Sequence, residues 1–147
     1  MSASKNKSMV SSANSVFNND GVHRILIVAN DKQFSGYLVE LLQGLPDQIQ
    51  AEIANGGFET GQKLQAFHPH TVLLDLMMPG ITSFDVCQKI KENPETCGTR
   101  VVVMGYHAPE NMRQAMRAGA EAYLAKPFDK RQLFKAIVLG ELNTAEK

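Results

Sequence analysis

The sequence predicts an α/β protein built on a doubly wound parallel sheet of five strands. Three short apolar runs, at residues 25–29, 72–74 and 101–104, have the length and the Val, Ile and Leu content of strands buried on both faces. Two runs of mixed polarity, at residues 49–54 and 121–124, are weaker candidates of the kind found in edge strands. Helical spacing of apolar residues separates these runs. The predicted order is therefore βαβαβαβαβα, with helices on both faces of the sheet.

The first helix is predicted to follow the first strand directly. Its apolar residues recur at i, i+4, i+7, i+8 and i+11 and form one stripe: Phe34, Leu38, Leu41, Leu42 and Leu45. Asn30 or Asp31 can cap the start of this helix, and Gly44 with Pro46 indicates its end.

Shorter apolar patterns predict the second and third helices. The second helix carries Leu64 and Phe67 and follows a Gly-Gly pair. The third helix has Thr82 or Ser83 as its N-cap. Its apolar face consists of Phe84, Cys87 and Ile90.

The last two helices have clear start signals. Pro109 suits the first position of the fourth helix, and Gly119 suits a left-handed residue just after its end. The apolar residues between them are Met112, Ala115 and Met116. The fifth helix is predicted to begin at Asp129, with Gln132 completing a capping box. It is expected to bury Leu133, Phe134, Ile137 and Val138.

The composition limits the class of protein. The 147 residues suit one domain, which we place at residues 23–141 between an N-terminal tail (1–22) and a C-terminal tail (142–147). Fifteen basic and fifteen acidic residues cancel, so no excess charge favours nucleic acid or a membrane surface as the partner. The two cysteines fit neither a disulfide framework nor a zinc spacing. No apolar run approaches the roughly 20 residues of a membrane helix, so we expect a cytoplasmic protein with reduced thiols.

The first 22 residues differ from the rest of the chain. Serine and asparagine dominate them, and few apolar residues interrupt the polar sequence. Such a composition cannot offset the entropy lost on ordering, so a flexible tail is expected. The alternative is a helix around Val16 and Phe17 that docks on a partner.

The carboxyl ends of the predicted strands carry the candidate functional residues, because ligands of such sheets bind there. Asp75 follows the buried third strand. Lys126 follows the fifth strand and precedes Pro127, which restricts the backbone of Lys126 to extended conformations. From a neighbouring strand, the ammonium of Lys126 could bind Asp75 or an oxyanion attached to it. The alternatives are a turn role for Asp75 and a purely structural ion pair.

The chain from about residue 24 to residue 139 resembles the receiver domain of bacterial two-component response regulators. The resemblance rests on Ile25-Leu26-Ile27-Val28, Asp75 with Met78-Pro79, Gly119-Ala120 followed by Tyr123, and Lys126-Pro127-Phe128. It implies a flavodoxin-like (βα)5 receiver fold and a signalling role rather than an enzymatic one. It also implies that Asp75 accepts a phosphoryl group from a histidine kinase, that Mg²⁺ and Lys126 neutralise the charge, and that Tyr123 is the aromatic switch residue.

The sequence departs from this family around the expected metal site. Where the family has two adjacent acids after the first strand, this chain has Ala29 and Asn30. Asn30 therefore stands in place of the principal magnesium-ligating acid, beside Asp75 and the Met77 carbonyl. Magnesium prefers anionic oxygen ligands, so we expect Mg²⁺, the usual cofactor of the family, to bind weakly here. Gly105 stands where the family has a switch hydroxyl, and Ser83 stands near a usual turn glycine.

Two further residues are candidates for contacts with this pocket. Asp31 lies one place after Asn30, and His107 lies two residues beyond Gly105, from where it could overhang the pocket. A solvated loop position is the alternative for His107. Tyr106, Met112 and Met116 either pack within the domain or supply part of a partner surface.

The main hypothesis is a stand-alone receiver-like module of two-component (phosphorelay) signalling. It would act through contacts with a histidine kinase or a downstream effector, with Mg²⁺-dependent phosphorylation of Asp75 impaired or absent. One alternative is a working phosphoacceptor on Asp75, and another is a scaffold in which Asp75 is only structural. An aspartate-dependent phosphohydrolase is disfavoured, because such enzymes need a second acid where this chain has Met77. The face of the fourth helix could also mediate homodimerisation.

Overall fold

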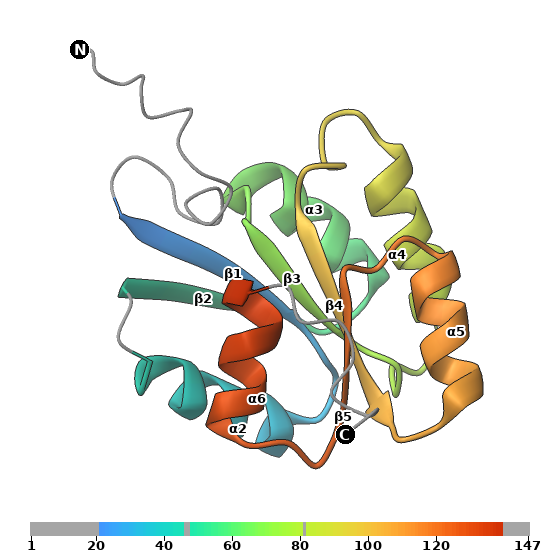
Figure 1. Cartoon of the computed structure of the whole chain (residues 1–147). Coiled ribbons are helices and arrows are strands. Elements are labelled where there is room, and N and C mark those ends of the chain that lie inside the picture. Colours follow the sequence, from blue (N-terminus) through green and yellow to red (C-terminus); the bar gives the residue numbers. More distant parts are fainter. Residues whose placement is uncertain (1–20, 46–47, 81, 140–147) are drawn as a thin grey trace.

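A computed structural model describes residues 21–45, 48–80 and 82–139 of the chain. In this part of the chain, five parallel strands form one sheet in the order β2-β1-β3-β4-β5, and helices alternate with them along the sequence (Figure 1). The predicted βαβαβαβαβα order and the doubly wound sheet are therefore confirmed. Pro46, the C-terminal tail and all but the last two residues of the N-terminal tail lie outside the described residues. Val22 already belongs to the first strand.

The three most apolar runs form the centre of the sheet, as predicted. They are β1 (Val22–Val28), β3 (Thr71–Asp75) and β4 (Arg100–Tyr106). The runs of mixed polarity form the edge strands β2 (Gln48–Ala54) and β5 (Ala122–Lys126). The register pairs Val28 with Leu74, Asp75 with Met104, and Tyr106 with Lys126. The carboxyl ends of β1, β3, β4 and β5 consequently lie close together.

Helices cover both faces of the sheet (Figure 1). One face is covered by α2 (Lys32–Gln43) and α6 (Lys130–Phe134), which continues into a π-helical turn, η2 (Lys135–Leu139). The other face is covered by α3 (Gly57–Phe67), α4 (Ser83–Glu92) and α5 (Pro109–Arg117). None of the helices in the described part of the chain has the length and apolar character needed to span a bilayer.

The helix ends follow the predicted signals. Asp31 caps α2, since its carboxylate accepts hydrogen bonds from two backbone N–H groups of the first turn. Asp129 and Gln132 form the predicted capping box at the start of α6. Gly119 adopts the left-handed conformation after α5, with φ of 101°. Thr82 is the N-cap of α4 but makes no side-chain capping bond.

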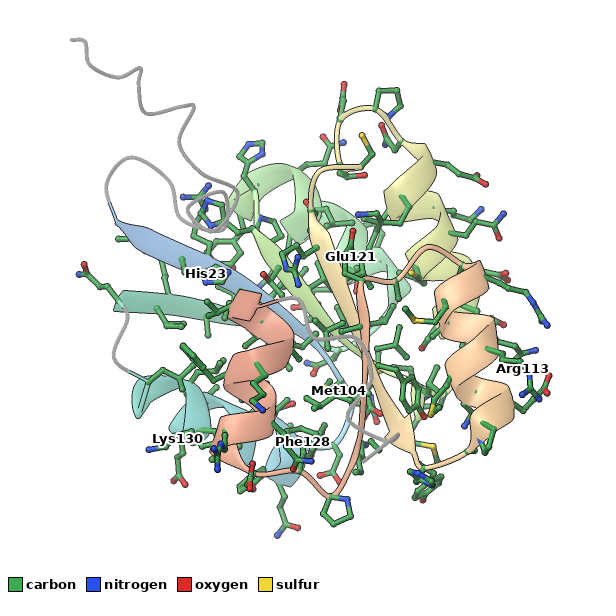
Figure 2. The ribbon with its side chains drawn as sticks, in the orientation of Figure 1. His23, Met104, Arg113, Glu121, Phe128 and Lys130 are labelled. Carbon is green, nitrogen blue, oxygen red and sulfur yellow. The ribbon has the colours of Figure 1, made fainter. Side chains whose placement is uncertain are left out.

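Two apolar layers form the core, one on each face of the sheet. Because side chains alternate along a strand, Ile25 and Ile27 pack against α2 and α6, whereas Leu26 and Val28 pack against the helices of the other face. Met104 lies in the first layer, in the middle of the molecule (Figure 2). In α6 and η2, Leu133 and Ile137 are fully buried. The other two residues of the predicted apolar face, Phe134 and Val138, are half-buried.

The two cysteines are free thiols. Cys97 is exposed, and Cys87 lies in the second core layer. Burial raises the pKa of Cys87 to about 11, so its thiol stays protonated at neutral pH. Cys87 is therefore a small apolar core residue.

Candidate functional site

Asp75 is a buried carboxylate at the carboxyl end of the central strand β3. Its five-residue strand is buried throughout, and Asp75 itself is only 2% exposed. Asp75 Oδ1 accepts a hydrogen bond from the Met77 N–H at 3.0 Å, which fixes the turn that follows the strand. The Ser83 hydroxyl donates a hydrogen bond to the Asp75 carbonyl oxygen at 2.7 Å and ties the start of α4 to this turn. The unexpected serine thus has a local structural role.

Lys126 lies against Asp75. Its Nζ donates a hydrogen bond to Asp75 Oδ1 at 2.9 Å, and its side chain is 21% exposed. The two residues do not lie on neighbouring strands, because β4 separates β3 from β5. The long lysine side chain spans this distance, so the ammonium reaches the carboxylate across the end of β4.

The segment after β1 contributes no carboxylate contact to Asp75. The Ala29 N–H donates a hydrogen bond to the Ala54 carbonyl oxygen at 3.1 Å, which extends the pairing with the edge strand. The exposed Asn30 side chain donates to the Asn55 carbonyl oxygen at 3.4 Å. Asp31 Oδ1 accepts from the N–H groups of Gln33 and Phe34. The first acid after the strand is therefore engaged with its own helix.

The described residues offer few metal ligands. No group of three or more His, Cys, Asp or Glu side chains in this part of the chain could hold a metal ion. Of the ligands that the sequence predicts, Asp75, Asn30 and the Met77 carbonyl, only Asp75 is anionic. Its Oδ1 already accepts two hydrogen bonds.

Tyr123 and Leu76 fill the space around Gly105, near the carboxyl end of β4. Tyr123 is fully buried, and its hydroxyl donates a hydrogen bond to the Tyr106 carbonyl oxygen. A Cβ atom at position 105 would lie 2.6 Å from Tyr123 Oη and 2.7 Å from Leu76 Cδ1. The tyrosine ring and Leu76 therefore occupy the space that a side chain at position 105 would need.

Burial also changes the pKa of this tyrosine. It raises the pKa of Tyr123, although a hydrogen bond with Asn111 acts in the opposite direction. The hydroxyl consequently remains a donor at neutral pH and keeps its bond to the β4 backbone.

The residues after Gly105 face the solvent. Tyr106 is 61% exposed, and His107 is exposed as well. His107 directly follows β4, at an exposed bend. Met77 is also exposed. Apolar side chains at the rim of the site are therefore open to contact with another molecule.

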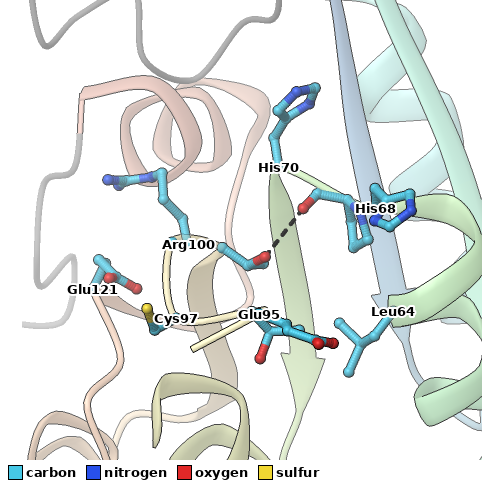
Figure 3. Close-up of a pocket in the computed structure, with 11 residues that line it drawn as sticks. Leu64, His68, His70, Glu95, Cys97, Arg100 and Glu121 are labelled. Carbon is cyan, nitrogen blue, oxygen red and sulfur yellow. Dashed lines mark hydrogen bonds between the residues drawn. The ribbon is translucent and has the colours of Figure 1, made fainter. Parts of the chain in front are cut away.

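A hollow lies at the opposite end of the sheet. Its volume is about 530 Å³, and it is lined from the α3–β3 and α4–β4 connections, which a Thr99–Pro69 hydrogen bond joins (Figure 3). Two of the charged residues that line it make contacts within the protein. Arg100 donates to the Ala136 carbonyl oxygen, and Glu121 pairs with Lys91 at 2.6 Å. Glu95, which also lines the hollow, is exposed.

Two residues that contact the site were not predicted from the sequence. The Phe34 ring lies with its centroid 4.0 Å from Lys126 Nζ, although its spacing indicated only a core residue of the first helix. Leu76 fills the space beside Gly105. Both contacts join segments far apart in the chain, so helical or strand periodicity could not reveal them.

A single buried carboxylate with one ammonium partner has limited chemical scope. It can attack a phosphoryl group only where positive charge neutralises the incoming oxygens. Among the described residues, Lys126 is the cation in direct contact with Asp75. The arrangement also suits a fixed ion pair at the rim of a docking surface.

The pattern of the response regulator receiver domain family matches residues 25–138. Among curated proteins, the chain is 28% identical over 115 residues to the phosphate regulon transcriptional regulatory protein PhoB of Rhizobium meliloti, covering 78% of this chain and 50% of that protein. The chain thus spans about half the length of this relative.

Solved structures show the same fold. The signal receiver domain of a DNA-binding response regulator protein (merR) from Colwellia psychrerythraea 34H superposes with a TM-score of 0.73 and 34% identity, covering 78% of this chain and 94% of that one. The signal receiver domain of a response regulator from Bermanella marisrubri gives a TM-score of 0.70 and 33% identity, covering 78% and 93%. The flavodoxin-like receiver fold expected from the resemblance is therefore confirmed.

Proposed function

This chain belongs to the response regulator receiver domain family, and we propose that it transmits a two-component signal through protein–protein contacts with Mg²⁺-dependent phosphorylation of Asp75 impaired or absent. Receiver domains of this family work with histidine kinases and effectors.

The main support for the proposal is that Lys126 supplies the positive charge that faces Asp75. Lys126 Nζ lies 2.9 Å from Asp75 Oδ1, and the position of the principal magnesium-ligating acid holds the neutral Asn30. Two unit charges about 4 Å apart attract by about 4 kcal/mol at an effective dielectric of about 20, so losing a carboxylate removes several kcal/mol of gross attraction for a divalent ion. The donors present do not fit Mg²⁺, because one already neutralised carboxylate is their only anionic group.

Gly105 supports the same conclusion from the switch side. It offers no hydroxyl to a phosphoryl group on Asp75, and Tyr123 already occupies the adjoining space. The inward position of Tyr123 thus needs no phosphoryl group to hold it. We therefore expect the surface around the exposed Tyr106 to bind its partner without prior phosphorylation.

The partners follow from the family and from this surface. We propose a histidine kinase or a downstream effector protein as the partner, and neither nucleic acid nor a membrane. A second copy of the chain docking through α5 would use the same region.

Phosphodonor labelling tests the proposal. The full chain is incubated with acetyl phosphate and Mg²⁺, and intact mass is used to measure the fraction that gains one phosphoryl group. We expect at most a trace adduct in the wild type. In Asn30→Asp we expect the fraction to rise about tenfold, which corresponds to about 1.4 kcal/mol of recovered attraction for Mg²⁺.

Matched variants make the outcome decisive. Asp75→Ala reports labelling elsewhere, and Asn30→Ser changes the same residue without adding charge. A stoichiometric adduct in the wild type that disappears in Asp75→Ala would overturn the proposal and favour an ordinary phosphoacceptor. The observation that favours this second function, a working phosphoacceptor, is the buried position of Asp75 next to Lys126.

A further inference from the structure

The ammonium of Lys126 has a second contact, which comes from helix α2. Its Nζ lies 4.0 Å from the centroid of the Phe34 ring. This distance is well within the roughly 6 Å over which an aromatic face attracts a cation. Lys126 is thus held by a carboxylate at 2.9 Å and by an aromatic face.

The Phe34 ring is itself fixed by its neighbours. It is half-buried against the first core layer, and it meets the Phe128 ring edge-on, with 6.2 Å between the centroids and 75° between the planes. The ring therefore cannot turn away from Lys126 without losing this packing.

Helix α2 holds the connection after Lys126 at another point. Tyr37, one turn beyond Phe34, donates a hydrogen bond from its hydroxyl to the Phe128 carbonyl oxygen at 3.2 Å. Tyr37 is 44% exposed, so this bond, rather than deep burial, fixes its ring. Together the two aromatic residues of α2 hold both ends of the segment from Lys126 to Phe128.

We infer that Phe34 is a positioning residue that holds the ammonium of Lys126 on Asp75, so that the lysine is the lasting counter-charge of this carboxylate. The inference rests on the proposed function, in which no divalent ion supplies that charge. A lysine ammonium is strongly hydrated and its stem is flexible, so an ion pair that is open to water is weak. The aromatic face restricts this freedom and shields the ammonium, which strengthens the pair.

The positioning role has a measurable chemical consequence. An ammonium that is held by Asp75 and Phe34 reacts slowly with acylating reagents, because reaction requires the free amine in contact with solvent. Lys130, on the next helix, is exposed and provides an internal reference. The ratio of the labelling rates of Lys126 and Lys130 therefore reports how firmly Lys126 is held.

The test is limited acetylation of the full chain with acetic anhydride, followed by peptide mass spectrometry. We expect Phe34→Leu to raise the Lys126/Lys130 rate ratio by about twofold to thirtyfold, the range that corresponds to cation–π energies from exposed to desolvated sites. Phe34→Tyr keeps an aromatic face and should leave the ratio near the wild-type value. Tyr37→Phe keeps the Phe34 ring and should change the ratio less than Phe34→Leu does.

The outcomes distinguish positioning from packing. If Phe34→Leu lowers the melting temperature but leaves the rate ratio unchanged, Phe34 only packs and the inference is overturned. If the leucine variant fails to fold, Phe34→Met provides a second non-aromatic variant. Its Lys126/Lys130 rate ratio is interpreted in the same way. Stoichiometric phosphorylation of the wild type would overturn the proposed function without changing the rate ratios, so the two failures are separable.

Discussion

At the scale of single residues, Gly105 leaves the space near the carboxyl end of β4 to other side chains. Gly105 does not have a positive φ, so its backbone conformation does not require glycine. The close neighbours of position 105 require a residue without a side chain. The Tyr123 hydroxyl and Leu76 take the space where a Cβ atom would lie. The glycine and the inward tyrosine therefore depend on each other.

Replacing Gly105 with alanine tests this dependence. The new Cβ would lie 2.6 Å from Tyr123 Oη, so either the tyrosine or the strand must shift. We expect Gly105→Ala to lower the free energy of unfolding by about 1–3 kcal/mol, the usual cost of overpacking a core. Chemical denaturation is the measurement.

A double-mutant cycle with Tyr123→Phe provides the control. The phenylalanine lacks the hydroxyl that lies closest to the new Cβ, so Gly105→Ala should cost less in this background. Strictly additive losses would mean that the tyrosine hydroxyl does not restrict position 105.

At the scale of secondary-structure elements, α6 depends on its first residue. The α-helical part spans only Lys130–Phe134 before η2 begins, so few intrahelical bonds stabilise it. Asp129 Oδ1 accepts from the Gln132 N–H at 2.9 Å, and Gln132 Oε1 accepts from the Asp129 N–H at 3.0 Å. This capping box fixes the start of the helix directly after the segment that carries Lys126.

We expect Asp129→Ala to destabilise the protein by about 1 kcal/mol, since it removes the side-chain acceptor of the N-cap. Asp129→Asn keeps an acceptor and should retain most of the stability. Thermal unfolding followed by circular dichroism compares the two variants. Equal melting temperatures for both would show that the cap contributes little here.

At the scale of the whole molecule, the two ends of the sheet have different roles. The carboxyl end holds the Asp75–Lys126 pair, whereas His23 lies near the amino end of β1. Figure 2 shows His23 and Phe128, which follows β5, at different ends of the sheet. His23 is fully buried, and its Nε2 lies 2.9 Å from the Thr71 hydroxyl. Burial, together with the nearby His70 and Arg100, lowers the pKa of His23 to about 4.

This histidine makes folding sensitive to acid. The pKa of His23 is about 4 in the folded state and near 6.5 in the unfolded chain, so the unfolded state takes up the proton first as the pH falls. The free energy of unfolding should decrease between about pH 6.5 and pH 4, by up to about 3 kcal/mol, and this contribution should level off below pH 4.

Comparison with His23→Gln isolates the effect, because glutamine can face Thr71 but does not titrate. The difference in unfolding free energy between wild type and variant, measured by denaturation across this range, should shrink or reverse as the pH falls. A difference that stays constant with pH would show that His23 does not titrate between the two states.

Part of the site could be predicted because its signals are local. Asp75 follows an apolar run, and Lys126 precedes a proline, so each could be placed at a strand end from its immediate neighbours. The substitutions Asn30 and Gly105 could be located in the same way. Phe34 could not be assigned to the site, because a core residue and a cation–π partner have the same position in a helical stripe.

The sequence by itself determined the order of the elements, their helix caps and the parallel sheet, because periodicity and capping depend on residues close together in the chain. Only the tertiary structure decided that Lys126 reaches Asp75 across β4, that the Phe34 ring covers its ammonium, and that Tyr123 takes the space beside Gly105. These contacts join residues far apart in the sequence. Their geometry depends on how helices and strands pack together, and no local pattern encodes it.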